Sequence, residues 1–207
     1  MSNGIKVKKR KGHIEPLNLE KMHVMVEQAC EGLAGVSASQ VEIQSGIQFY
    51  DGISTAEIQE ILIRSASDLI DLDHPNYQFV AARLLLFSVR KSIFGRIREV
   101  PTVREHVVDM IERGVYDPEL IELYDDEDYI KLESFIDHDR DYMFTYAGLR
   151  QVVDKYLVQD RSTGAVHETP QFMYLLIAAS IFSKYPKETR LDYVKKYYDA
   201  ISKHKIN

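Results

Sequence analysis

Residues 5–21 read IKVKKRKGHIEPLNLEK and carry the first strong structural signal of the chain. Apolar and basic residues alternate as far as Gly12, where the chain can turn, and a second extended run follows to Leu17. Asn18 is a favourable N-cap for a helix that begins directly after it. The pattern therefore predicts a β-hairpin that leads into a helix.

The residues after this hairpin predict a unit with four helices. Apolar side chains at helical spacing mark the first helix. The second and third helices each begin at a capping box, formed by Ser37 with Gln40 and by Ser54 with Glu57. A fourth helix is expected from about residue 76 to residue 94. We therefore expect a first domain over residues 1–95.

Residues 96–207 predict a second segment that is again mainly helical. An almost wholly apolar helix is expected over residues 171–183, and an amphipathic helix over residues 189–203. The inner face of that amphipathic helix is expected to carry Tyr193, Val194, Tyr197 and Ile201. A second small hairpin is expected over residues 157–168, with its turn at Thr163-Gly164. The other expected helices are 103–113, 118–124, 127–137 and 142–156. The fold class is mainly α with small β-hairpins.

The composition excludes several classes of protein. Of the 207 residues, 45% are hydrophobic and 28% are charged, which is typical of a soluble globular chain. The 26 basic and 32 acidic residues give a net charge of −6, so the overall charge does not favour nucleic acid. No apolar run approaches the roughly 20 residues of a membrane span, and the N-terminus lacks the apolar core of a signal peptide. We therefore expect a cytoplasmic protein that does not contact a membrane.

Two features offer little chemistry. Cys30 is the only cysteine, which excludes an intramolecular disulfide and a CxxC zinc site, and we interpret it as a small core residue. The charged cluster Asp137-His-Asp-Arg-Asp141 could bind a divalent metal. The interpretation we favour is a charge network at the surface, because Asp137 and Asp141 would share one face of a helix. We therefore expect no metal site.

The hairpin gathers five basic residues within six positions, namely Lys6, Lys8, Lys9, Arg10 and Lys11. One interpretation is a solvated strand edge that its lysines protect from aggregation, and another is a nucleic-acid tail. A third is a polyphosphate site, because the hairpin leads into a helix N-terminus whose N–H groups and dipole favour anions. Lys9 and Arg10 would then contact phosphates, with Lys21 one turn further on. Glu15 and Asn18 could meet the amino group and ring nitrogens of a base.

Several of these motifs resemble those of a known family. Residues 7–12 (VKKRKG), residues 15–21 (EPLNLEK), Gly52-Ile-Ser-Thr55 and the later Arg83, Arg90 and Lys91 are similar to an ATP-cone, the regulatory nucleotide-binding module of many ribonucleotide reductases. The second half is similar to the helical segment that follows the cone in the class I large (alpha) subunit, at residues 135–141 (FIDHDRD), 155–159 (KYLVQ), 163–164 (TG), 186–190 (PKETR) and 198–200 (YDA). The similarity covers nearly the whole chain. Zinc-ribbon repressors of reductase genes also carry a cone, but the single cysteine excludes them.

The resemblance implies an allosteric site for ATP or dATP, bound together with Mg²⁺. Its nucleotide-binding residues would be Lys9, Arg10, Glu15, Pro16, Leu17, Asn18, Leu19, Glu20, Lys21, Thr55 and Lys91. In this family ATP in the cone favours activity, and dATP, where it inhibits, drives assembly into an inactive oligomer. Gln59 and Ser88 stand where family members with a strong dATP off-switch usually carry histidines, and Glu57 stands where a shorter aspartate is common. We therefore expect ATP binding with weakened or absent dATP inhibition.

The resemblance also implies that the catalytic chemistry lies outside this chain. The family chain continues from a point equivalent to residue 207 into a ten-stranded α/β barrel, which holds the radical and redox cysteines. We expect a split or excised part of the alpha subunit that docks on the barrel through the apolar helix near Phe172–Phe182. It would support deoxyribonucleotide synthesis only with that barrel and the radical-generating beta subunit. The alternatives are a stand-alone nucleotide-sensing module that regulates a partner and, less favoured, a nucleic-acid binder.

Overall fold

The computed structural model describes residues 4–9 and 12–206. These residues are mainly helical with one short antiparallel hairpin, so the expected fold class is confirmed. Packing divides the chain into two compact units. The first comprises the residues up to Ser88 together with Tyr142–Gln151, and the second comprises Val89–Asp141 together with the residues from Val152 onward.

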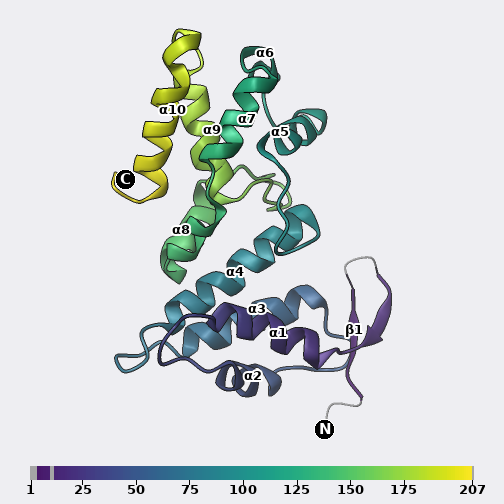
Figure 1. Cartoon of the computed structure of the whole chain (residues 1–207). Coiled ribbons are helices and arrows are strands. Elements are labelled where there is room, and N and C mark those ends of the chain that lie inside the picture. The colour runs from purple at the N-terminus through teal and green to yellow at the C-terminus, as the bar shows by residue number, and fades with distance from the viewer. Residues whose placement is uncertain (1–3, 10–11, 207) are drawn as a thin grey trace. The chain divides into compact units, whose positions relative to one another are not determined.

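The first unit joins the hairpin to a group of amphipathic helices, and Figure 1 shows the hairpin at one end of the helices α1 and α3. Val7 lies opposite Glu15 in the hairpin, with its side chain buried in the unit. The elements are β1 (Lys6–Lys8), β2 (Ile14–Pro16), α1 (Leu19–Cys30), α2 (Ala38–Gly46), α3 (Thr55–Asp68) and α4 (Tyr77–Phe94). The boundary between the two units falls within α4, after Ser88.

The second unit is built around the helix α9, which is apolar on all sides. Phe172, Leu175 and Ala178 of α9 are fully buried, and Val194 and Tyr198 of the following helix pack against them. A helix with this composition is stable only when neighbouring elements cover it. The elements are α5 (Val103–Glu112), α6 (Glu119–Leu123), α7 (Asp126–Phe135), the 3₁₀ helix η1 (His138–Met143), α8 (Tyr146–Lys155), α9 (Pro170–Phe182) and α10 (Lys187–Ser202), of which η1 and α8 extend into the first unit. None of the described helices combines the length and the apolar character that a membrane span requires.

The second expected hairpin, over residues 157–168, is only partly formed. A single β-bridge pairs Gln159 with Val166, and no strand forms there among the described residues. The Asp160 carboxylate accepts the backbone N–H groups of Ser162 and Thr163, so a side chain organises this turn. These bonds compete with the backbone pairing that would extend a ladder.

The inner face of α10 is rotated from the predicted one. Val194 is buried as expected, but Tyr193 is 46% exposed and stacks on Phe182 at the rim of the unit. The buried residues of this helix begin four positions before Val194 and are Arg190, Leu191, Val194, Tyr198 and Ser202. The sequence interpretation was wrong because tyrosine rings are large enough to cover a core edge from outside it.

The charged cluster at residues 137–141 is only in part the surface network that the sequence suggested, because Arg140 pairs with Asp137 and Asp199 whereas Asp141 is buried. The 3₁₀ helix η1 begins at His138, directly after Asp137, so Asp137 and Asp141 do not share a face as they would in an α-helix. Asp141 is buried, lies 3.4 Å from Arg90 Nη2 and accepts a hydrogen bond from Gln171 Nε2 at 2.8 Å. Burial raises the pKa of Asp141 to about 6. Within residues 4–9 and 12–206, no group of three or more His, Cys, Asp or Glu side chains is arranged to hold a metal ion.

Candidate functional site

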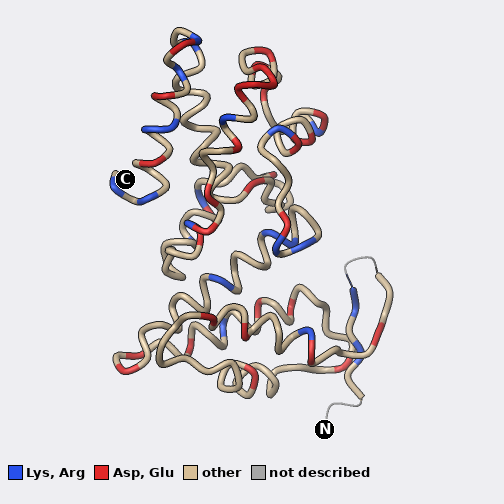
Figure 2. The backbone as a smooth tube through the Cα atoms, viewed as in Figure 1, with Lys and Arg blue, Asp and Glu red and all other residues tan. Residues whose placement is uncertain are grey.

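The basic hairpin is closed by an ion pair between two of the predicted site residues. Lys9 Nζ lies 2.8 Å from Glu15 Oε1, and both side chains are about one-third exposed. The hydrogen bond from Lys9 holds the pKa of Glu15 below its usual value. The backbone of Lys9 also donates to the carbonyl of His13 and accepts from Gly12. A cation and a carboxylate that were expected to meet phosphate and base are therefore paired with each other. Figure 2 shows basic positions on one strand of the hairpin and an acidic position on the other.

Helix α1 begins directly beside this hairpin. The Leu17 N–H donates to the carbonyl of Ile5 at 2.9 Å, which fixes the chain entering the helix. Asn18 then caps α1, as the sequence predicted, because its Oδ1 accepts the backbone N–H of Lys21 at 2.8 Å. That bond commits the Asn18 carbonyl oxygen to the helix, so the Nδ2 group is the part of this side chain suited to a base.

The start of helix α3 is hydrogen-bonded to the same strand, an arrangement that no local pattern in the sequence indicated. The Lys8 N–H donates to the carbonyl of Ile53 at 2.9 Å, and the Gly52 N–H donates to the carbonyl of Lys6 at 2.8 Å. Gly52 has a φ of +85°, a conformation that favours glycine. Ser54 follows with the full capping box predicted with Glu57, and Thr55 is the first residue of α3.

The structure therefore brings two helix N-termini to one basic strand. The first turn of a helix has N–H groups without intrahelical partners and the positive end of the helix dipole. Each cap here satisfies one such N–H group, at Lys21 in α1 and at Glu57 in α3. Together with Lys9, this geometry can bind an anion through backbone donors and a side-chain cation. Arg10 lies outside the described residues.

Gln59 and Ser88, which stand in place of the family's histidines, face each other. The Ser88 hydroxyl lies 3.4 Å from Gln59 Oε1, and Gln59 is buried on α3. Lys91 lies on α4 three residues after Ser88, in the part of that helix that belongs to the second unit. Its place relative to the hairpin stays a prediction.

The remaining predicted residues are divided between the hairpin and a nearby hollow. Pro16 ends β2, opposite Lys6. Leu17, Leu19 and Glu20 line a hollow of about 550 Å³ whose other walls include α2. These three residues therefore line a hollow shared with α2, in addition to lying close to the hairpin in the sequence.

Sequence reasoning missed a histidine that lines this hollow. His23 Nδ1 lies 2.8 Å from Glu42 Oε1, and Nε2 lies 3.1 Å from Glu27 on its own helix. The hydrogen bond with Glu42 raises the pKa of His23. The spacing of His23 and Glu27, one helical turn apart, was an available signal, whereas the pairing with Glu42 depends on tertiary packing.

Comparison with known proteins assigns both halves of the chain. Residues 5–92 match the ATP cone domain, and residues 142–207 match the ribonucleotide reductase all-alpha domain. Over all 207 residues the chain is 52% identical to ribonucleoside-diphosphate reductase 1 subunit alpha of Salmonella typhimurium and 51% identical to that of Escherichia coli. Over 205 residues it is 37% identical to the ribonucleoside-diphosphate reductase subunit alpha of Enterobacteria phage T4.

These matches cover 98–100% of this chain but only 26–27% of each relative, so the chain spans about a quarter of their length. The fold and the matches together place the chain among proteins that carry an ATP cone followed by a reductase helical domain. It belongs to the ribonucleotide reductase family and corresponds to the N-terminal region of ribonucleoside-diphosphate reductase alpha subunits.

Proposed function

We propose that the hairpin end of the first unit binds ATP or dATP as an allosteric effector of ribonucleotide reduction. The observation that carries this proposal is the convergence of two capped helix N-termini, those of α1 and α3, on one basic strand. Such a site favours a polyphosphate through backbone N–H groups and helix dipoles, before any side chain is counted. The match of residues 5–92 to the ATP cone domain supports the same ligand class.

The proposed contacts follow from the chemistry of each residue. Lys9, Arg10 and Lys91 supply positive charge to the phosphates, and the Thr55 hydroxyl donates at the start of α3. Residues 15–21, from Glu15 to Lys21, form the wall that receives the base and ribose. Mg²⁺ would be held mainly by the nucleotide's own phosphates, the usual arrangement for this ion.

In this proposal, Gln59 on α3 and Ser88 on α4 are the groups that affect the discrimination between ATP and dATP. Gln59 and Ser88 are neutral and hydrogen-bonded to each other, so neither adds positive charge to a phosphate site. A ligand shifts an equilibrium between assemblies only through different affinities for the two states. With this source of differential affinity weakened, ATP binding persists and inhibition by dATP is reduced or absent.

The biological setting follows from the family. Residues 1–95 act as the cone and residues 96–207 as the helical segment of a cytoplasmic reductase. The chain works together with the barrel part of the alpha subunit and the radical-generating beta subunit, where deoxyribonucleotide synthesis takes place. Cys30 is partly buried and burial raises the pKa of its thiol to about 11, so it is a poor nucleophile. The only thiol of this chain is therefore unsuited to the reduction itself.

Calorimetric titration of the 207-residue chain with MgATP tests the effector site directly. Replacing Lys9 by glutamine should weaken MgATP binding about tenfold, the usual effect of losing a charge-assisted hydrogen bond. Lys6→Gln is the matched control, because Lys6 bonds to Asp51 and Gly52 through its backbone. No ATP binding by the unmodified chain would overturn the proposal. Equal losses of MgATP affinity in both variants would show that Lys9 has no specific contact with the nucleotide.

Glu15→Gln separates the phosphate and base contacts. In the structure Glu15 holds Lys9, so its removal should let tripolyphosphate bind about two- to fivefold more tightly. MgATP should instead bind about tenfold more weakly, because it loses the carboxylate contact to its base. Tighter or weaker binding of both ligands alike would refute the assignment of Glu15 to the base.

A test of the dATP hypothesis requires the assembled reductase. The double variant Gln59→His and Ser88→His should bind dATP about tenfold more tightly and gain dATP inhibition in a reductase assay. Strong dATP inhibition of the unmodified assembly would overturn the hypothesis. ATP binding without any effect on a complemented reductase would favour the stand-alone nucleotide-sensing module.

A further inference from the structure

Helix α4 belongs to both units, because the boundary between them falls after Ser88. Ser88 and Lys91, three positions apart on this helix, are the residues of α4 that the proposed function places at or beside the effector site. Arg90 lies between them in the sequence. Successive residues of an α-helix are about 100° apart around its axis, so Arg90 leaves the helix in a different direction from both. One turn of α4 therefore carries groups for the effector site and a cation that is directed elsewhere.

Arg90 is part of a buried polar network inside the second unit. Its side chain is 4% exposed, and its Nη2 donates to the His138 carbonyl at 3.0 Å and lies 3.4 Å from Asp141 Oδ2. Gln171 Nε2 on α9 donates to the other oxygen of the Asp141 carboxylate at 2.8 Å. Asp141 itself lies on η1 and is buried. This carboxylate therefore connects the end of α4 to the start of α9.

The network continues from Gln171 to α10 and on to the backbone before η1. The Tyr198 hydroxyl donates to Gln171 Oε1 at 2.8 Å and accepts the Asp137 N–H at 2.8 Å. Because a hydroxyl has one proton, Tyr198 gives it to Gln171, and the amide of Gln171 then donates to Asp141. Every group in this chain thus donates in the direction of the carboxylate, and bonds aligned in this way strengthen one another. Weakening one bond of the chain should therefore weaken the others.

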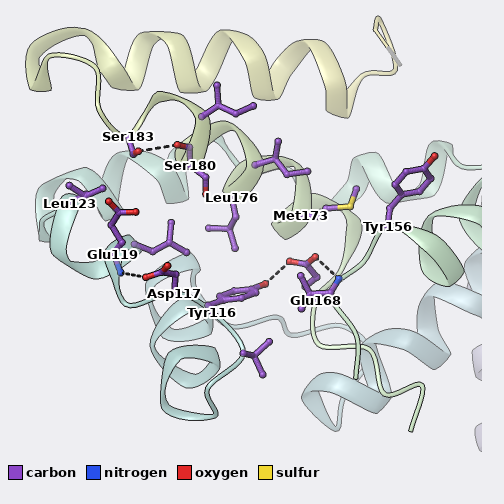
Figure 3. Close-up of a pocket in the computed structure, with 15 residues that line it drawn as sticks. Tyr116, Asp117, Glu119, Leu123, Tyr156, Glu168, Met173, Leu176, Ser180 and Ser183 are labelled. Atoms are coloured by element: carbon purple, nitrogen blue, oxygen red, sulfur yellow. Dashed lines mark hydrogen bonds between the residues drawn. The ribbon is translucent and has the colours of Figure 1, made fainter. Parts of the chain in front are cut away.

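Another buried acid of the second unit shows a different arrangement. Glu168 accepts from the Tyr116 hydroxyl at 2.5 Å and from the Val158 N–H at 2.8 Å, and Figure 3 shows the Tyr116 hydroxyl directed at Glu168. Both of these donors lie outside α4. Asp141, by contrast, is held by a residue of α4, so a change in this helix acts on Asp141 directly.

We infer that this network couples the effector site to the core of the second unit through Arg90. The inference rests on the proposed function, and it adds the route by which nucleotide binding reaches the second unit. A polyphosphate that pairs with Lys91 restrains the last turns of α4, and the restrained helix holds Arg90 against Asp141. Coupling between two sites is reciprocal, so the intact network in turn favours the nucleotide-bound form of α4.

Amide hydrogen exchange in the 207-residue chain, followed by NMR, tests the coupling. Saturating MgATP should slow exchange of the Asp137 amide at least about fivefold, which is the lower end of the usual coupling between two sites. The Tyr129 amide, which donates to the Asp125 carbonyl in the same unit, is the control and should keep its exchange rate. Unchanged exchange of the Asp137 amide in a chain that binds MgATP would overturn the inference.

Two tyrosine variants separate this coupling from a general loss of stability. Tyr198→Phe removes the hydroxyl of the network, and Tyr124→Phe removes a hydroxyl that donates to the Ala179 carbonyl at 2.7 Å in the same unit. Both tyrosines are at most 2% exposed, so both variants should lower the stability of the second unit to a similar degree. Tyr198→Phe should also weaken MgATP binding about two- to fivefold, whereas Tyr124→Phe should leave that affinity unchanged. Equal MgATP affinities of the two variants would overturn the inference.

A comparison without nucleotide keeps the test independent of the proposed function. Tyr198→Phe should speed amide exchange over residues 88–91 of α4, and Tyr124→Phe should not, because only the first hydroxyl belongs to the chain of bonds that ends at Arg90 and Asp141. Arg90→Lys, which keeps the charge but loses the planar fork, should in turn speed exchange of the Asp137 amide, and it provides the readout if Tyr198→Phe does not fold.

The two failures are distinguishable. Absence of MgATP binding by the unmodified chain would overturn the proposed function, and the comparison without nucleotide would still show whether the network reaches α4. Equal exchange over residues 88–91 in both tyrosine variants, together with an unchanged Asp137 amide in Arg90→Lys, would overturn the coupling even in a chain that binds MgATP.

Discussion

Replacing Asp128 by asparagine should destabilise the second unit strongly, because it leaves a buried guanidinium without its carboxylate. The side chains of Asp128 and Arg190 are 5% and 7% exposed, and Arg190 Nη2 donates to Asp128 Oδ2. The guanidinium also lies over the ring of Tyr124, 4.3 Å from its centre. Arg190 Nε is buried and donates no hydrogen bond within the described part of the chain. The ring cannot replace the carboxylate as a full counter-charge.

The size of the loss follows from this burial. Removing one partner of a buried ion pair costs about 3–5 kcal/mol, since the remaining charge stays desolvated. Asparagine preserves the shape and can still accept the Asp125 N–H that Asp128 accepts at 3.3 Å, so the helix cap survives. Asp126→Asn is the matched control on the same helix. Its pair with Arg104 spans 2.9 Å, but the two side chains are 81% and 52% exposed, and the cost should stay below about 1 kcal/mol.

Urea unfolding followed by far-ultraviolet circular dichroism measures both variants. The two compact units are fitted as separate transitions where two are resolved, and the loss should fall in the second. Combining Asp128→Asn with Arg190→Met should cost no more than Arg190→Met alone, which gives a coupling of about 2 kcal/mol or more. Additive losses in this cycle, or equal small losses for Asp128→Asn and Asp126→Asn, would refute the reasoning.

Three further predictions concern the two cores and the site. Leu175→Ala should cost about 2–5 kcal/mol in the same assay because Leu175 is fully buried, while Ile177→Ala on the exposed face should stay within about 1 kcal/mol. Ser54→Ala should lower the stability of the first unit by about 0.5–2 kcal/mol through loss of its helix cap, measured by thermal unfolding. Glu42 raises the folded-state pKa of His23 above 6.5. The stabilisation of the folded state by this His23–Glu42 interaction is therefore complete below pH 6.5 and is lost as the pH rises through the raised pKa. A thermal melt series from pH 5.5 to 8 should show this decline, and His23→Gln should flatten it.

The local features of the fold were the ones that the sequence could predict. Asn18 caps α1 and Ser54 with Glu57 caps α3, as expected, because each depends on residues at most three positions apart. The hairpin also formed as expected, since alternation and a glycine turn act over a few residues. Within the described residues these short-range signals recovered the α-helices and the first hairpin, but they missed the 3₁₀ helix η1 and predicted a second hairpin that forms only one β-bridge.

The buried polar groups were the features that the sequence could not predict. Asp141 meets Arg90 from 51 positions away, and Glu168 meets Tyr116 from 52 positions away. Periodicity shows which face of a helix is apolar, but it does not show which charged side chain another helix will cover. A charged cluster in the sequence was therefore assigned to the surface, although one of its members is among the most buried acids of the second unit.

The candidate site shows the same division between local and tertiary information. The place of Lys9 in a hairpin that leads into α1 followed from the order of residues along the chain. The arrival of α3 at the same strand depends on bonds from Lys6 and Lys8 to residues more than forty positions later, which no local pattern encodes. That second N-terminus is made of backbone, so side-chain motifs alone understate the capacity of this site for anions.

A site built largely from backbone has a consequence for its regulation. Substituting one side chain can change affinity or nucleotide preference, but the N–H groups and dipoles at the starts of α1 and α3 remain as long as the helices fold. Polyphosphate affinity and discrimination between ATP and dATP are then separable properties. Under the proposed function, the first would depend on the hairpin and the starts of α1 and α3, and the second on a few side chains such as Gln59 and Ser88. Loss of the backbone bonds that hold both helix starts to the strand should therefore weaken the binding of both nucleotides alike, whereas changes at those two side chains should alter only the ratio of the two affinities.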